Sequence, residues 1–147
     1  MAKSKQRRGA RRSLLMREIC VLGVEPFVST RAESVRGGGA FVESGSWINI
    51  EGELDEAVRG QCLAAISVHL ATSDEVGTSM PPSIGAIISL RPRLHAVVSI
   101  PGTEFDHIWT MANTGTLKYC VLVFTEPFRR SALVTNAQFS NRSQNEA

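Results

Sequence analysis

Apolar and polar residues alternate with a period of two from Trp47 onward, and this alternation constrains the fold more than any other feature of the chain. Because successive side chains of a β-strand point to opposite faces, such alternation predicts half-buried strands. The first run places Ile48, Ile50 and Leu54 between polar residues, and the second places Cys62, Ala64, Ile66, Val68 and Leu70 on one face.

Two further pairs of apolar segments predict β-hairpins. Residues 84–90 and 94–100 flank Arg91-Pro92-Arg93, and residues 117–124 and 131–139 flank the Pro-containing segment 126–130. A short polar break between two strand-like runs is typical of a hairpin. The segment from Tyr119 to Phe124 is apolar at every position, which favours a central strand that is buried on both faces.

One helix is expected between the hairpins, over residues 104–114. Its apolar residues recur at helical spacing, at Phe105, Ile108, Trp109 and Ala112. Thr103 is a suitable N-cap, and Gly115 is a suitable C-terminal stop. We expect this helix to cover a sheet face or to plug one end of the β-structure.

These elements predict a mainly β fold. The expected architecture is an antiparallel sandwich or partly open barrel of about six strands with one packed helix, and the alternative is an α+β fold. A length of 147 residues and an apolar fraction of 43% fit a single globular domain with a tail. We assign the globular domain to residues 47–140 and a flexible C-terminal tail to residues 141–147.

The charge of the chain is concentrated at its N-terminus. Residues 1–19 contain one acid, Glu18, and seven basic residues, which are Lys3, Lys5, Arg7, Arg8, Arg11, Arg12 and Arg17. This segment carries +6, and because the whole chain carries +2, the remainder carries −4. A concentrated basic segment favours an anionic partner such as nucleic acid.

The first 46 residues predict little regular structure. Residues 1–19 form the basic arm, in which residues 1–13 lack periodicity and are expected to be disordered, while residues 13–22 could form a short helix. Residues 20–46 contain Gly37-Gly38-Gly39 and are interpreted as a Gly/Ser-rich linker. The triple glycine lacks the spacing of a phosphate-binding loop.

Two groups of charged residues are candidate sites on the globular domain. Arg91, Arg93, Arg129 and Arg130 form two pairs in the predicted turns, and they would make a second cationic site if both turns lie at the same end. Glu51, Glu53, Asp55 and Glu56 form an acidic strip that could dock the basic arm, a cation or a basic partner. The simpler interpretation is that both groups are solvated surface.

The sequence contains no catalytic or metal-binding signature. His69, His95 and His107 are each isolated, and no cofactor motif occurs, so no metal or cofactor is expected. Cys20, Cys62 and Cys120 are widely spaced, which favours a reducing, cytoplasmic location with Cys62 and Cys120 buried. The basic start is also compatible with organelle targeting. No apolar stretch approaches the roughly 20 residues of a transmembrane helix.

The favoured function is a non-enzymatic binding or assembly module with an electrostatic arm. The first alternative is a non-specific nucleic-acid-binding protein acting through the arm, because a basic arm before a β-domain resembles the plan of small viral coat proteins. The second is a small enzyme or ligand carrier with a pocket between helix 104–114 and the sheet, using Trp109, His107 or His95. A protein partner or a second copy of the chain is compatible with each interpretation.

Overall fold

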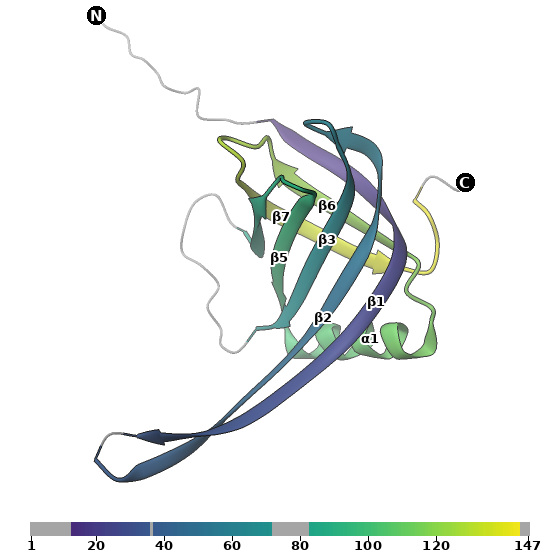
Figure 1. The fold of residues 1–147 in the computed structure, drawn as a ribbon. Helices are drawn as coiled ribbons and strands as arrows, with labels where there is room; N and C mark the ends of the chain where they lie inside the picture. The colour runs from purple at the N-terminus through teal and green to yellow at the C-terminus, as the bar shows by residue number, and fades with distance from the viewer. Residues whose placement is uncertain (1–12, 36, 72–82, 145–147) are drawn as a thin grey trace, which may run out of the picture.

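The chain folds into a closed β-barrel with one helix across its end (Figure 1). The computed structural model describes residues 13–35, 37–71 and 83–144. The elements are β1 (Leu14–Val35), β2 (Gly39–Val58), β3 (Gln61–Leu70), β4 (Gly85–Ser89), β5 (Leu94–Ile100), α1 (Gly102–Thr114), β6 (Tyr119–Thr125) and β7 (Ala132–Ser140). The strand order around the barrel is β1-β2-β3-β5-β4-β7-β6.

The predicted mainly β fold with one helix is confirmed, and the sheet closes with one strand more than expected. The extra strand is β1, whose first part, Leu14–Cys20, pairs with β6. Its later part pairs with β2, so β1 joins the two edges of what would otherwise be an open sheet. Closure removes unpaired edges from the barrel. The β3–β5 pair is parallel, and the other pairs are antiparallel.

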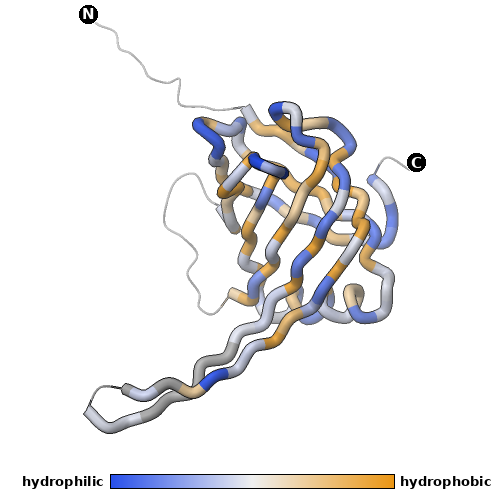
Figure 2. The backbone as a smooth tube through the Cα atoms, in the orientation of Figure 1, coloured by the Kyte–Doolittle hydropathy of each residue, from blue (hydrophilic) through white to orange (hydrophobic). Residues whose placement is uncertain are grey.

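The core of the barrel comes from the inward half of each alternating strand. Ile48 and Ile50 are buried as predicted, and their outward neighbour Asn49 is partly exposed. Fully buried side chains come from every strand of the barrel, including Ile19, Ile66, Ile87, Val98, Phe124 and Val134. Figure 2 shows apolar segments along the barrel strands and hydrophilic segments gathered at the turns of its upper end.

The short helix expected over residues 13–22 is wrong, because this segment is the start of β1. Burial here follows a period of two, with Ile19 fully buried and Leu14 and Met16 more than half exposed. A short helix supplies its own hydrogen bonds but is marginal alone. Pairing with both β2 and β6 supplies more bonds and buries Ile19, so tertiary structure overrides the local apolar pattern.

The linker interpretation of residues 20–46 is also wrong. Residues 20–35 belong to β1 and residues 39–46 to β2, and the ladder between the two strands continues to the pair Val35–Gly39. Gly37 and Gly38 have φ values of 102° and 98°, which few other residues adopt, so these glycines form the turn of a hairpin. Figure 1 shows this hairpin, here called the ribbon, extending away from the barrel.

Both predicted hairpins are confirmed. Strands β4 and β5 pair antiparallel, as do β6 and β7. The consecutive residues Val121 and Leu122 are both buried, so β6 is covered on both faces as expected. Residues 71–83, a polar stretch with Pro81-Pro82 that predicts a loop, lie almost wholly outside the described residues.

Helix α1 lies across one end of the barrel (Figure 1). Phe105 and Ile108 are buried in the core, as their spacing predicts. Gly115 ends the helix in the left-handed conformation, with φ of 73°, and this prediction is confirmed. The predicted N-cap is wrong by two residues, because the helix begins after Pro101, whose fixed φ already suits a helix start.

Part of the predicted C-terminal tail packs on the barrel. The buried carboxylate of Glu18 accepts hydrogen bonds from the Ser143 hydroxyl at 2.7 Å and the Gln144 backbone N–H at 2.6 Å. Glu18 lies opposite Val121 in the β1–β6 register, so these contacts hold residues 143 and 144 near the outer face of β6. Residues 145–147 lie outside the described range.

Candidate functional site

The topology brings the two arginine-bearing turns to the same end of the barrel. Ile87, near the end of β4, pairs with Ala132 at the start of β7. The β4–β5 turn and the β6–β7 turn are therefore neighbours. Arg91, Arg129 and Arg130 are exposed there, and the Arg93 side chain is 41% exposed.

A third turn at this end adds a basic residue that sequence reasoning missed. Because β3 runs parallel to β5, with Ala64 opposite Leu94, both strands start at the same end. Arg59 lies in the turn that precedes β3, and its guanidinium donates a hydrogen bond to the carbonyl of Pro127 in the β6–β7 turn. The sequence feature that could have predicted this turn is the Arg59-Gly60 pair, because a glycine between two alternating runs is typical of a turn.

The basic N-terminal segment joins the barrel at the same end. Leu14 pairs with Thr125, and the Glu126 backbone N–H donates to the carbonyl of Ser13 at 2.9 Å. Ser13 is therefore held against Glu126, which lies three residues before Arg129 in the β6–β7 turn. The predicted anion-binding residues Lys3, Lys5, Arg7, Arg8, Arg11 and Arg12 lie outside the described residues, and the described chain begins at the cationic turns.

The β6–β7 turn displays its two arginines on a tight backbone loop. Phe128 and Ser131 exchange backbone hydrogen bonds of 2.8 and 3.1 Å. Arg129 and Arg130 between them have φ values of 59° and 99°, and the Arg129 guanidinium lies 5.3 Å from the centre of the Phe128 ring. Positive φ at consecutive non-glycine residues costs free energy, which stabilising contacts elsewhere must offset.

Arg17 is part of the barrel wall, which corrects its assignment to a separate arm. Its Nε donates to the Glu56 carbonyl at 3.0 Å, and its Nη2 lies 3.8 Å from the Glu56 carboxylate. Only 14% of the Arg17 side chain is exposed, because β1 pairs with β2 and β6 on either side of it. Arg17 therefore binds Glu56 of the acidic strip within the barrel wall.

The rest of the acidic strip also meets residues of this chain. The Asp55 carboxylate accepts a hydrogen bond from the Glu18 backbone N–H at 3.1 Å. Glu51 forms an ion pair of 3.6 Å with Arg93, and Glu53 is exposed. Basic residues of β1 and of the β4–β5 turn therefore contact the strip. Docking of residues 1–12 on it stays a prediction.

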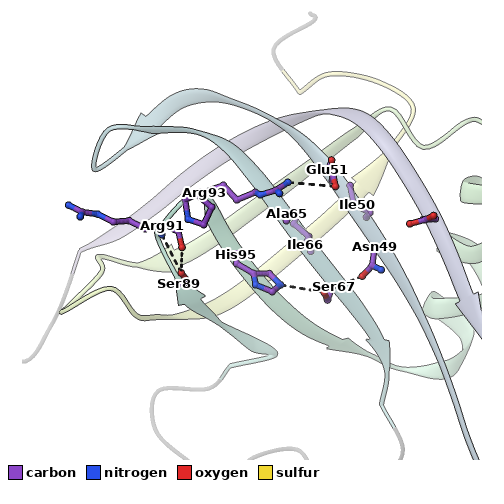
Figure 3. Close-up of a pocket in the computed structure, with 12 residues that line it drawn as sticks. Asn49, Ile50, Glu51, Ala65, Ile66, Ser67, Ser89, Arg91, Arg93 and His95 are labelled. Carbon is purple, nitrogen blue, oxygen red and sulfur yellow. Dashed lines mark hydrogen bonds and ion pairs between the residues drawn. The ribbon is translucent and has the colours of Figure 1, made fainter. Parts of the chain in front are cut away.

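A groove of about 380 Å³ lies on the outer face of the barrel beside the β4–β5 turn (Figure 3). One side is a polar line across three strands, in which the Ser67 hydroxyl lies 3.3 Å from Asn49 Oδ1 and 3.5 Å from His95 Nε2. The other side is the Arg93–Glu51 ion pair. Because Ala65 separates the two sides and has only a methyl group, the face is hollowed between them.

Three rings form a row next to the polar line. Phe27 and Trp47 are stacked with ring centres 4.6 Å apart, and Trp47 and His69 are stacked at 6.0 Å. The row follows the strand register, in which Phe27 lies opposite Trp47 and Trp47 lies opposite His69. It stands on the outer face, two residues along β2 from Asn49.

The histidines do not assemble a metal site. His95 lies opposite Ala65 in the β3–β5 register, four residues along β3 from His69, so the two imidazoles do not meet across the sheet. Over the described residues, no three His, Cys, Asp or Glu side chains are placed to hold a metal ion.

A second groove, of about 400 Å³, lies between α1 and β7, where the sequence predicted a pocket. His107 and Glu104 are its polar members, and Phe139 and Met111 are among its apolar ones. Trp109 instead packs near Phe105, with ring centres 5.8 Å apart, and His95 lies in the outer-face groove. The groove therefore unites only part of the predicted set.

The cysteines divide into one buried and two exposed thiols. Cys120 is fully buried as predicted, and this burial raises the pKa of its thiol far above the usual range. Cys62 is exposed, so its predicted burial is wrong. It shares the inward register with Ala64 but stands near the start of β3, at the rim of the barrel.

Comparisons of the chain with known protein families, with curated proteins and with solved structures found no match. No helix in the described part of the chain is long and apolar enough to cross a membrane. The described residues define the protein by its fold, which is a closed seven-stranded β-barrel with one packed helix and a projecting ribbon.

Proposed function

We propose that this protein is a non-enzymatic binding module that holds the phosphate backbone of a nucleic acid at one end of its barrel. The observation that carries the proposal is the convergence of Arg59, Arg91, Arg93, Arg129 and Arg130 from three separate turns. The described chain begins beside them at Ser13, and six basic residues precede Ser13 in the sequence. We call this set of turns, with Ser13, the cationic end.

The arrangement suits a polyanion because its charges are spread over several turns. A phosphate backbone presents repeated charges, and each Lys or Arg contact releases a counterion. Arg guanidinium groups also match phosphate oxygens in a two-pronged geometry. Nearby carboxylates reduce the net charge only in part. Glu51 pairs with Arg93, and Glu56 pairs with Arg17. Glu126 is exposed in the same turn as the exposed Arg129 and Arg130.

The test is a titration of fluorescent oligonucleotides at several salt concentrations. The full chain should bind with a steep negative dependence of log K on log salt, about −0.9 per phosphate contact for duplex DNA. The double variant R129Q/R130Q should weaken binding and make that slope shallower by about one to two. The matched control is K118Q, because exposed Lys118 lies at the opposite end of the barrel, just before β6.

Two results would overturn the proposal. One is the absence of binding by the full chain even at low salt. The other is an equal loss of affinity per positive charge removed in R129Q/R130Q, which loses two, and in K118Q, which loses one. That result would show a response to net charge rather than to the cationic end.

A second candidate function is assembly through the ribbon, with another copy of the chain as the partner. An isolated two-stranded hairpin is marginally stable in water. Beyond Val21, no described strand pairs with the outer edge of β1. Leu22, Phe27 and Val28 are exposed there by 64%, 46% and 61%. Because the barrel itself is closed, the unpaired strand edges of the described residues lie in the ribbon. A second ribbon could add to one of these edges.

Light scattering distinguishes a monomer of this chain from a dimer or larger assembly. The full chain should have the mass of a dimer or larger assembly, and V28K should shift it toward the monomer by placing a charge in the apolar contact. A monomer mass for the unaltered chain at concentrations of about 100 μM, where stable interfaces persist, would exclude assembly through the ribbon.

A further inference from the structure

We propose that the outer-face groove receives an unpaired base of a single-stranded nucleic acid whose phosphates lie on the cationic end. The inference rests on the proposed function and adds a substrate class to it. Its basis is the groove between the polar line Asn49–Ser67–His95 and the Arg93–Glu51 pair (Figure 3).

The lining can recognise a group that has both donors and acceptors at its edge. Asn49 offers an amide, Ser67 a hydroxyl and His95 a ring nitrogen, and all three are partly exposed. An amide and a hydroxyl can each donate and accept, which fits the mixed donor and acceptor edges of nucleobases. Asn49 lies directly opposite Ser67, and His95 lies diagonally from Ser67, opposite Ala65. Their spacing is therefore fixed by the pairing of β2, β3 and β5.

The charge of the groove favours a neutral group over a free anion. Arg91 and Arg93 line it together with Glu25 and Glu51, so two positive charges face two negative ones. A lone phosphate would meet the two carboxylates, whereas an uncharged base would not be repelled. The phosphate contacts therefore belong at the cationic end, and the base contacts belong in the groove.

The groove is continuous with that end. Arg91, Pro92 and Arg93 line the groove, and they also form the β4–β5 turn of the cationic end. A strand held by its phosphates at this turn can therefore lay a base beside Ser67 without leaving the protein surface. In a duplex the base edges are paired and stacked, so this contact requires a single strand.

The ring row offers a stacking position for a neighbouring base. Trp47 is two residues from Asn49 along β2, a separation of about 7 Å. The rings face one another along the row, so a base would continue the stack at an end, next to His69 or Phe27. Stacking on aromatic rings is a common mode of binding single strands and tolerates any base.

The test compares three fluorescent probes of equal length at fixed salt, an oligothymidine, an abasic oligonucleotide and a duplex. The full chain should bind the oligothymidine about ten times more tightly than the abasic strand, because only the oligothymidine has bases to place in the groove. Both strands have the same phosphates, so the difference in affinity measures the base contact alone. Binding should also quench tryptophan fluorescence, because Trp47 lies beside the groove.

The variants S67A and H95A should each reduce that tenfold preference to about two- or threefold and leave the salt slope unchanged. S99A is the matched control, because Ser99 is exposed on the outer face of β5 but does not line the groove. Circular dichroism melting curves would check that each variant is folded.

The two proposals fail in different ways. Equal binding of the oligothymidine and the abasic strand would overturn the groove inference and leave phosphate binding at the cationic end intact. Preference for the duplex, or an equal loss in S67A and S99A, would also overturn it. Failure to bind any of the three probes would overturn both proposals.

Discussion

Gly52 faces β1 with no room for a side chain, and replacing it with alanine should destabilise the barrel. An added Cβ would lie 2.4 Å from the backbone oxygen of Cys20 and 2.5 Å from the Ile19 side chain. Ordinary contact begins at 3.4 Å, so β1 would have to retreat by about 1 Å. The clash is with backbone and with a fully buried side chain, and neither can move aside cheaply.

The size of the effect follows from this displacement. A retreat of about 1 Å takes one or two ladder hydrogen bonds beyond useful length, and each contributes about 0.5–1.5 kcal/mol. Repacking Ile19 adds about 1–3 kcal/mol, the usual cost of overpacking a core. We expect G52A to lower the free energy of unfolding by about 2–4 kcal/mol, and the melting temperature by roughly 5–15 °C.

Gly23 provides the matched control, because it lies across the same strand pair and its added Cβ would meet nothing within 4 Å. G23A should be neutral or should raise the free energy of unfolding by about 0.4–1 kcal/mol, through lower entropy of the unfolded chain. Urea denaturation followed by circular dichroism measures both variants. If the two agree within about 0.5 kcal/mol, the close approach at Gly52 does not exist and the reasoning is wrong.

Two further predictions concern buried groups. E18Q should lower the free energy of unfolding by about 1–3 kcal/mol, because the carboxylate accepts two short hydrogen bonds from residues 143 and 144. Thermal melts of E18Q against E53Q, the same change at an exposed glutamate of β2, would measure it. Ellman's reagent should titrate the exposed Cys20 and Cys62 rapidly and Cys120 only on unfolding. Because burial raises the Cys120 pKa, unfolding releases a proton above pH 9, so stability should fall there. C120A should remove that component of the pH dependence, and an unchanged profile would contradict it.

Elements whose pattern is local could be predicted from the amino-acid sequence. The alternation around Ile48 and Ile50, the two hairpins and the apolar face of α1 were all predictable, because burial on one side imposes a period of 2 on strands and 3.6 on helices. The helix stop at Gly115 was predictable for a similar reason, because few other residues accept its left-handed conformation.

The grouping of the candidate sites could be predicted only in part. The arginine pairs were visible as charges in turns, but their common end depends on the pairing of Ile87 with Ala132, 45 residues apart. Arg59 was missed because its neighbours at the cationic end come from other hairpins. The groove was missed because Asn49, Ser67 and His95 are unremarkable residues until three strands align them.

Tertiary structure alone decided the path of the described residues between 13 and 46. Leu14, Leu15 and Ile19 fit a short helix as well as a strand, and the glycines at 37–39 suit a linker as well as a hairpin turn. The choice depended on β6, a strand about 100 residues away that closes the barrel on β1. A helix satisfies its hydrogen bonds within its own sequence, whereas a strand satisfies them only with a partner that the fold brings alongside.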